Sequence, residues 1–554
     1  MMNRIVPGIF CAMTLLLASS AAQPAPSPSP LYRITGTVAN SVTGEPVQRA
    51  TVAVLSVSDH QAVASVESGN DGQFALEGLA AAKYELVALR RGFLLSLYNQ
   101  HELFNTAIVT GEGQLTDGLI LRMTPVASLH GVVTGDGGDP VENAKILLFL
   151  KPHNPGARIT QKAETTTDDT GAYDFGELAP GEYFLAVTAK PWYALHHSAL
   201  RQRPVADPST ALDVAFPVTF FDSTTEDASA TPILLAAGSR EEANINLHAV
   251  PALHLTAESP MRTDWIAART ELRQIIFGSL ASTDTITPHP APQTGTTEFT
   301  GVAPGHYELT QGNPPRIAEL DATASQQLDA NLGKPAMDLS GTLRTSSGAA
   351  LPDKVSLNIE SLEGVHRQES IFVKTSDGDF TFQSIRLGNY QLTASTPDKR
   401  LPITSITVGN RTHPGNQLTV SDKPLQVVVT VSLGETRIEG FAKKTGVPGD
   451  RAIVARVEKG ENGVPGVMVV LVPKDLSAFP ALARRDQSDS DGSFALRDVA
   501  PGHYTIVAIE DGWNLDWERP EVISRYLPGG ISVNVTESSG KHLRLSEAVP
   551  VQNR

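Results

Sequence analysis

One short pattern occurs five times along this chain and constrains its fold more than any other feature. The pattern is a turn with Asp or Gly, an aromatic residue in an alternating apolar run, and a second turn before a tyrosine. Such a repeat has to be recognised first, because it defines the unit from which the chain is built. The copies span residues 71–84, 169–183, 295–307, 377–390 and 491–504.

Each copy predicts two β-strands. Asp-Gly favours a tight turn, because glycine accepts a positive φ. The alternating residues that follow, such as Phe494 and Leu496, place their side chains on one face of a strand. The second turn, Pro501-Gly502, precedes another alternating run from Tyr504. The pattern therefore predicts two neighbouring strands with one buried face.

A second pattern precedes four of the five copies. An alternating apolar run contains a glycine, a polar turn with proline follows, and another apolar strand comes next. The runs contain Gly36, Gly131, Gly341 and Gly440, whereas the third copy has only the weak equivalent 254–257. The tyrosines lie about 80 to 125 residues apart, close to the about 100 residues of a seven-stranded sandwich. Each repeat is therefore predicted to be a whole β-sandwich.

The predicted fold class is all-β, with five tandem immunoglobulin-like or prealbumin-like β-sandwich domains after a signal peptide. The third sandwich is expected to be degenerate. The predicted intervals are a signal peptide at 1–22, a Pro/Ser-rich linker at 23–30, and sandwiches at 31–125, 126–250, 251–335, 336–435 and 436–554.

The first 22 residues have the pattern of a secretory signal peptide. Arg4 precedes an apolar run from Ile5 to Leu17, and small residues follow. Cleavage is expected after Ala22, with cleavage after Ala21 as the alternative. The apolar run is shorter than the about 20 residues of a membrane anchor. The chain's single cysteine, Cys11, lies in this segment, so the mature protein would hold no disulfide. We predict an exported protein that is periplasmic, displayed on the cell surface or secreted.

Charge and hydropathy limit the partners. Lys and Arg number 44 against 60 Asp and Glu, giving a net charge of −16, whereas nucleic-acid binding needs clustered cations. No later stretch reaches about 18 consecutive apolar residues, so no transmembrane span is expected after cleavage. We predict no nucleic-acid partner, and the oligomeric state stays open.

The repeated residues resemble the carboxypeptidase regulatory-like domain family. The resemblance rests on Gly-x-Val, Gly-x-Pro-Val, Ala-x-Val-x-Val, Asp-Gly-x-Phe-x-Leu and Pro-Gly-x-Tyr-x-Leu, and it is clearest in the first, second and fifth repeats. It implies a transthyretin-like, carbohydrate-binding-like sandwich and an exported bacterial protein. It implies no enzyme, because the family has no common catalytic residues to transfer.

Three short motifs could carry chemistry, and each has a simpler interpretation. His366 and Glu369 form the sequence's one His-x-x-Glu pair, but they lie in an alternating strand run. His196 and His197 would point in opposite directions on a strand. The acids at 486–491 are spaced as in a calcium loop but lack the downstream Glu. We interpret these as a strand, an exposed loop and a turn, and expect no catalytic residue, metal or cofactor.

Four loop aromatics are the candidate binding residues. Trp192 and Tyr193 follow the tyrosine strand of the second repeat, and Trp513 and Trp517 follow that of the fifth. Flat rings stack on the C–H faces of sugars, so both pairs are candidate carbohydrate platforms. The alternative is that they fill a sandwich end or the joint between domains.

These patterns predict a non-catalytic, exported, multi-domain protein. Its expected partner is extracellular carbohydrate, another cell-envelope component or a cell-surface protein. Two alternatives stay open, namely a purely structural or adhesion scaffold and an accessory or inhibitor-like subunit of a secreted enzyme.

Overall fold

The structure is a computed structural model. It describes residues 30–554 except 153–157, 197–211, 259–269, 281–285, 287–288, 292–295, 445–462, 537–540 and the single positions 313, 330, 375, 424, 435 and 480. The predicted signal peptide lies outside the described residues. No helix in the described part of the chain is long and apolar enough to cross a membrane.

The fold is all-β, as the repeats predict, and consists of five β-sandwiches in chain order. In the first sandwich the sheet β4-β1-β8 packs on β3-β2-β5-β6, and β7 also pairs with β5. The bounds are β1 Tyr32–Asn40, β2 Thr51–Ser56, β3 Ala62–Glu67, β4 Gln73–Leu79, β5 Lys83–Leu89, β6 Ser96–Leu97, β7 Ile108–Val109 and β8 Leu119–Met123.

The second and third sandwiches repeat this plan with sheets of four or five strands. The second contains β9 Ala127–Thr134, β10 Lys145–Leu150, β11 Thr160–Thr166, β12 Ala172–Leu178, β13 Gly181–Thr188, β14 Val214–Ala215, β15 Thr219–Phe220, β16 Ile233–Leu235, β17 Arg240–Glu242, β18 Ile245–Asn246 and β19 Val250–Pro251. The third contains β20 Leu253–Glu258, β21 Glu271–Ile276, β22 Ser279–Leu280, β23 His289–Ala291, β24 Thr296–Val302, β25 Gly305–Gln311, β26 Arg316–Ala322, β27 Gln326–Leu328 and β28 Lys334–Pro335.

The fourth and fifth sandwiches complete the chain. In the fifth, β46 pairs with both β39 and β43 and so joins its two sheets along one side. The fourth contains β29 Met337–Thr345, β30 Ser356–Ser361, β31 Gln368–Phe372, β32 Asp379–Ile385, β33 Gly388–Ser395, β34 Arg400–Leu401, β35 Ile403–Val408, β36 Arg411–Pro414, β37 Gln417–Val420 and β38 Leu425–Val431. The fifth contains β39 Thr436–Lys443, β40 Met468–Pro473, β41 Arg484–Gln487, β42 Ser493–Val499, β43 Gly502–Ile509, the short helix α2 Pro520–Ile523, β44 Ile531–Val535, β45 His542–Arg544 and β46 Val549–Gln552.

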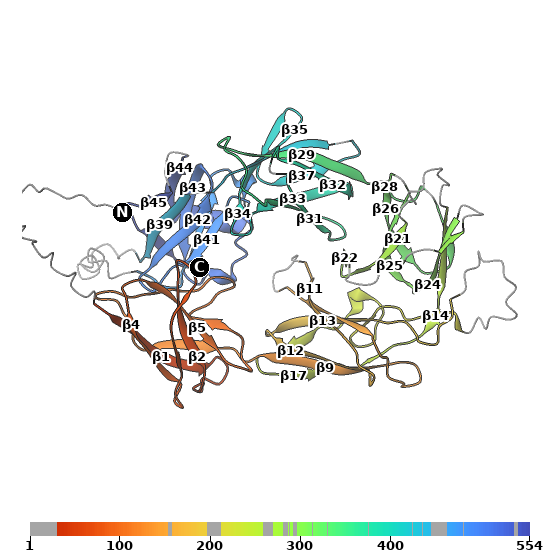
Figure 1. The fold of residues 1–554 in the computed structure, drawn as a ribbon, viewed down its shortest axis with the longest axis horizontal. Helices are drawn as coiled ribbons and strands as arrows, with labels where there is room; N and C mark the ends of the chain where they lie inside the picture. The colour runs from red at the N-terminus through yellow and green to blue at the C-terminus, as the bar shows by residue number, and fades with distance from the viewer. Residues whose placement is uncertain are drawn as a thin grey trace, which may run out of the picture.

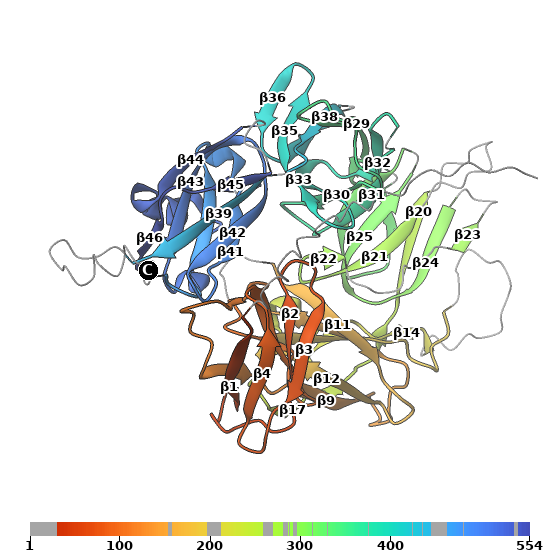
Figure 2. The same cartoon turned by 60° about the vertical axis from the view of Figure 1, so that its left-hand side comes forward.

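The five sandwiches follow one another around a closed ring (Figure 1), and the turned view agrees (Figure 2). The first sandwich, drawn in red, lies against the fifth, drawn in blue, although contacting residues such as Lys83 and Asp489 are 406 positions apart in sequence. Each sandwich keeps its own cluster of buried apolar side chains. The ring therefore consists of five separate cores connected through their surfaces.

The two strands around each Pro-Gly turn are successive but do not pair, which corrects the expectation of neighbouring strands. In the second sandwich β12 pairs with β9, whereas β13 pairs with β10 in the opposite sheet. The turn carries the chain across the sandwich rather than along one sheet. Both strands still bury one face, because the two sheets face a common core.

The repeated tyrosine holds this crossing in place. In every sandwich its hydroxyl donates to the carbonyl oxygen four residues earlier, as in the tyrosine corner of other β-sandwiches. The ring is buried, so the hydroxyl's hydrogen bond leaves no unsatisfied polar atom in the core. The donor–acceptor distances are Tyr84 to Ala80 3.2 Å, Tyr183 to Ala179 2.9 Å, Tyr307 to Ala303 2.8 Å, Tyr390 to Arg386 2.9 Å and Tyr504 to Ala500 2.9 Å.

Two glycines of the repeat are required by close backbone contacts. Gly171 of the Asp-Thr-Gly turn has a φ of +73°, and its carbonyl accepts a hydrogen bond from the Val133 amide at 2.8 Å. A Cβ on Gly131, in β9, would lie 2.1 Å from the carbonyl oxygen of Ala243 on the adjoining segment. The repeated Gly-x-Val therefore marks where two backbones meet without space for a side chain.

We expect Gly131→Ala to lower the free energy of unfolding of the second sandwich by about 2–3 kcal/mol, because the methyl group forces a backbone shift in a packed sheet. Urea unfolding would measure the loss. Gly176→Ala is the matched control, since its Cβ would meet only the Asp174 carboxylate at 3.8 Å. Equal stabilities for the two variants would contradict the proposed reason for the glycine.

Candidate functional site

The first predicted aromatic pair is on the surface. Trp192 follows β13, and 88% of its surface is exposed. The ring of Tyr193 lies beside it, with centroids 5.6 Å apart and planes at 90°. The pair forms an open aromatic corner, and its role as a carbohydrate platform stays a prediction.

Trp513 lies in the joint between the fifth and first sandwiches. Its ring stacks on His101, with centroids 5.1 Å apart and planes at 6°, and lies 5.5 Å from the ring of Phe104. Its indole N–H donates to the Gly466 carbonyl at 3.0 Å. Because rings of the first sandwich cover Trp513, its observed position is that of a joint residue.

Trp517 lies at the same joint and is also covered. The guanidinium of Arg485 stands 4.2 Å from the centre of its ring, a cation–π contact. Arg485 also pairs with Glu102 of the first sandwich, with 2.6 Å between Nη2 and Oε2. The structure thus brings Trp513 and Trp517 together but places Trp192 and Tyr193 in a different sandwich.

Polar contacts complete this joint, which we call the closure joint and define by residues 83–109, 485–493, 513 and 517. Lys83 Nζ lies 2.5 Å from Asp489 Oδ2; the Asp489 side chain is 14% exposed and that of Lys83 32%. The side-chain amide of Gln487 donates from Nε2 to the backbone carbonyl of Asn99 at 2.6 Å. The Ser490 amide donates to the Ala107 carbonyl at 2.9 Å. Apolar stacking, a shielded ion pair and backbone hydrogen bonds therefore act together.

The acidic segment 486–491 begins at the end of strand β41, and its residues 490–491 form the turn expected from the sequence. Asp491 accepts from the Ser493 amide at 2.9 Å, and Asp489 is engaged by Lys83. The described residues contain no group of three His, Cys, Asp or Glu side chains placed to hold a metal ion. Of these carboxylates, Asp489 contacts the first sandwich, whereas Asp486 and Asp491 accept hydrogen bonds within the fifth.

Sequence reasoning missed the first-sandwich half of the closure joint. His101 and Phe104 lie in the loop after β6, just as Trp513 lies in a loop after β43. One sequence signal of the joint was the continuous apolar run Met468–Val472 in β40, which indicates that both faces of this strand are buried. Its outer face packs against a cluster that includes Trp513 and Trp517.

The other histidine motifs also lie at joints. The His366 amide donates to the Gly278 carbonyl at 2.7 Å, linking the fourth and third sandwiches, and Glu369 pairs with Arg367. His196 Nδ1 lies 3.0 Å from Asp213, whose other oxygen lies 2.6 Å from His254 Nε2.

His254 also contacts the buried Glu298, with 3.0 Å between Nδ1 and Oε1. Burial lowers the pKa of His254, but the hydrogen bonds to Asp213 and Glu298 outweigh it, and the pKa is raised. This hydrogen-bonded chain therefore connects the second and third sandwiches. His197 lies outside the described residues.

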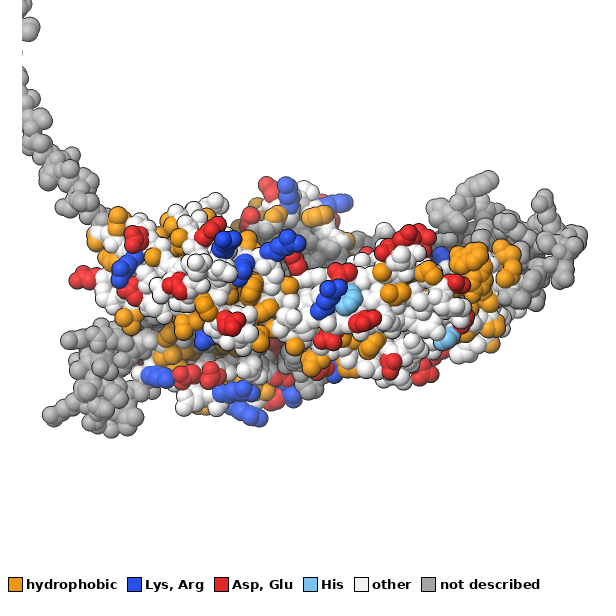
Figure 3. Space-filling view, turned by 90° about the horizontal axis from the view of Figure 1, so that it is seen from below, with side chains coloured by type: hydrophobic (Ala, Val, Ile, Leu, Met, Phe, Trp, Pro, Cys, Tyr) orange, Lys and Arg blue, Asp and Glu red, His pale blue; other side chains and the backbone are white. Residues whose placement is uncertain are grey.

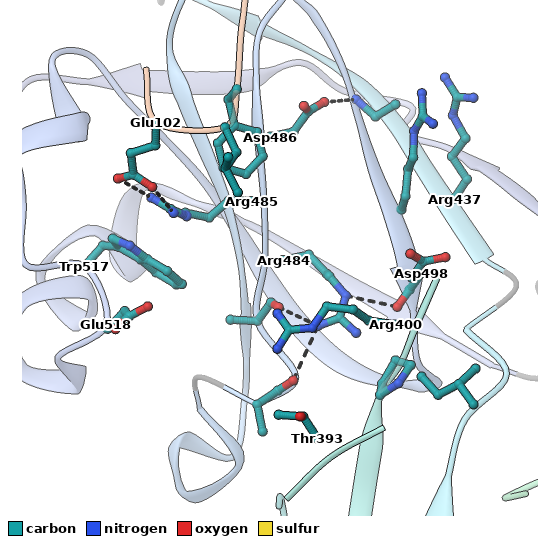
Figure 4. A pocket seen from close by; sticks show the side chains of 18 of the residues that line it. Glu102, Thr393, Arg400, Arg437, Arg484, Arg485, Asp486, Asp498, Trp517 and Glu518 are labelled. Carbon is teal, nitrogen blue, oxygen red and sulfur yellow. Dashed lines mark hydrogen bonds and ion pairs between the residues drawn. The ribbon is translucent and has the colours of Figure 1, made fainter. Parts of the chain in front are cut away.

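A cavity of about 690 Å³ opens beside the closure joint (Figure 4). It is lined by the first, fourth and fifth sandwiches, including Glu102, Arg400, Arg484 and Trp517. Asp486 lies at its edge, and burial raises the pKa of this carboxyl to about 7, partly offset by a hydrogen bond from the Ala495 amide. The cavity is therefore polar and carries charges of both signs.

Comparison with family models identifies the repeat. Residues 33–105 and 128–214 match the model of the carboxypeptidase regulatory-like domain. The first two sandwiches are carboxypeptidase regulatory-like domains. The prediction from the repeated Gly, Phe and Tyr positions is thus confirmed for these segments. A sequence search of curated proteins finds no match.

Solved structures align with these domains only loosely. The Bacillus anthracis TIE protein is 11% identical over 74% of this chain and 76% of its own, with a TM-score of 0.17. The Streptococcus agalactiae minor pilin is 11% identical over 42% and 99%, with a TM-score of 0.19. Two B repeat units of the Staphylococcus aureus collagen-binding protein are 9% identical over 73% and 100%, with a TM-score of 0.12.

We expect the carboxyl group of Asp486 to make the protein less stable as pH rises from about 4 to 7. Its pKa is about 7 in the folded protein and 3.8 ordinarily, so in this interval the unfolded chain loses the proton while the folded one keeps it. Above pH 7 the effect is constant.

Asp486→Asn removes this penalty, so its stability relative to wild type should increase between pH 4.5 and 7.5 in urea unfolding. Asp353→Asn, at an exposed carboxyl, is the control. A stability difference between Asp486→Asn and wild type that stays constant with pH would contradict the assignment.

Proposed function

We propose that this protein is an exported, non-catalytic scaffold that holds five carboxypeptidase regulatory-like sandwiches in a closed ring at or outside the cell envelope. The closure joint is the observation that carries the proposal. A linear spacer, which only sets the distance between its two ends, leaves its first and last domains apart. Here Trp513, Arg485 and Asp489 hold the fifth sandwich against the first. Such a ring presents its surfaces to a partner in a fixed arrangement.

The character of the closure joint supports a lasting contact. Removing Lys83 or Asp489 would leave the other charge without its partner in a partly shielded place. The stacked Trp513 and His101 add apolar contact at the same place. On the outer face seen in Figure 3, acidic and basic side chains are interspersed, which suits a soluble surface protein.

Trp513→Ala should open the ring, because it removes the ring that both His101 and Phe104 contact. Small-angle X-ray scattering should then show a larger radius of gyration and greater maximum dimension than in wild type. Trp192→Ala is the matched control, since Trp192 is exposed and distant from the closure joint. An unchanged scattering curve for a folded Trp513→Ala protein would overturn the closed-ring scaffold.

A second candidate function is carbohydrate binding at Trp192 and Tyr193. The specific observation is their geometry, an indole that is 88% exposed beside a tyrosine ring at 90°. An exposed indole of this size offers a flat apolar face to the C–H surface of a sugar ring. The ligand would be an extracellular polysaccharide or another envelope polymer.

Retention on immobilised polysaccharides tests this second function. Wild-type protein should be retained on at least one polysaccharide, and Trp192→Ala should lose most of that retention, because the exposed indole supplies the stacking face. Trp517→Ala is the comparison, since Arg485 already covers that ring. Equal retention of the two variants would remove Trp192 as the platform.

A further inference from the structure

The cavity beside the closure joint is built from three sandwiches that are far apart in sequence. Residues 83–107 of the first, 391–403 of the fourth and 481–498 of the fifth contribute to its lining. Its volume of about 690 Å³ is in the range of small-molecule sites. Because no single sandwich forms its wall, the cavity exists in this shape only while the ring is closed.

Several charges around the cavity already have partners. Lys83 is paired with Asp489, and Arg485 with Glu102. His60 lies 3.1 Å from Glu85. These groups support the walls, and their charges are locally compensated.

Arg484 differs, because neutral acceptors take its hydrogen bonds. Its guanidinium donates to the backbone carbonyls of Asp498 at 3.0 Å and Ala483 at 2.6 Å. Burial lowers the pKa of Arg484, and the nearby charge of Arg400 lowers it further. Two guanidinium groups therefore share one side of the cavity, near Thr393 (Figure 4).

Arg400 also lacks a compensating partner in the part of the chain that the structure describes, where no ion pair or side-chain hydrogen bond joins it to a carboxylate. The remaining acids of the cavity are Glu518, Asp498 and Asp486. Glu518 lies on the opposite side, next to Trp517 (Figure 4). Asp498 contributes an attraction to Arg484, but its recorded hydrogen bond is through the backbone oxygen.

We propose that this cavity is a binding site for a small acidic molecule, whose carboxylate or phosphate group lies between Arg400 and Arg484. Guanidinium groups present donors in a planar fork that matches both kinds of oxyanion, and such charge-assisted hydrogen bonds are about twice as strong as neutral ones. An anion there also relieves the repulsion between the two arginines. The Thr393 side chain borders the same place (Figure 4).

Binding at this site is coupled to ring closure. A ligand that contacts the fourth and fifth sandwiches inside a wall completed by the first favours the closed form by mass action. A bound ligand would thus stabilise the closed form of the ring. The inference goes beyond the scaffold function, because a closed ring is possible without any ligand.

Isothermal titration calorimetry on the full chain tests the site, with citrate as a carboxylate probe and inorganic phosphate as the second probe, both at low salt. We expect at least one probe to bind wild-type protein. Arg400→Gln should weaken that binding at least ten-fold, because one of the two guanidinium charges is lost. Arg411→Gln is the matched control, as Arg411 lies exposed on β36 of the same sandwich.

The two probes distinguish the source of the oxyanion, since binding of citrate alone indicates a carboxylate ligand and binding of phosphate alone a phosphate ligand. Trp513→Ala should also weaken binding if the wall from the first sandwich matters. Failure of both probes to bind, or equal affinities of Arg400→Gln and Arg411→Gln, would overturn the proposal. A closed ring in scattering without any binding would reject this site and leave the scaffold function in place.

Discussion

The hydrogen bond from each repeated tyrosine to the carbonyl four residues before it is the constraint on which the rest of the structure depends. It fixes the place where the chain crosses from one sheet to the other, as Tyr183 does between β12 and β13. Once that crossing is set, the alternating residues on both sides face the same core. The second turn and the tyrosine therefore recur at a constant spacing, because the hydroxyl reaches the carbonyl only when the turn lies between them.

The joints arise where the sandwiches depart from their shared plan. The buried tyrosines and turn glycines are nearly interchangeable between sandwiches, whereas His101 and Trp513 occur in segments between strands that differ from copy to copy. Cores thus keep the repeated residues, and the contacts between domains come from these segments and from outward-facing strand residues such as Arg485 of β41 and Lys83 of β5. This division explains how five similar domains form different contacts with their neighbours without changes to their cores.

The sequence was sufficient for the all-β class and for the number of sandwiches, because turns and alternation act over fewer than ten residues. It did not reveal that β12 and β13 lie in opposite sheets, since alternation marks a buried face but not the pairing partner. The contact of Trp513 with His101 was beyond it as well. That contact depends on the relative orientations of all five domains, and no local sequence pattern determines these orientations.

Ring closure also determines where the molecule carries mechanical load. Tension applied between the first and fifth sandwiches passes directly through Lys83, Asp489 and the stacked rings rather than around the other three domains. The second, third and fourth sandwiches form the longer path around the ring, and they carry the whole load only after the closure joint breaks. After that rupture the first and fifth sandwiches separate. The protein would then lengthen in one abrupt step before any core begins to unfold.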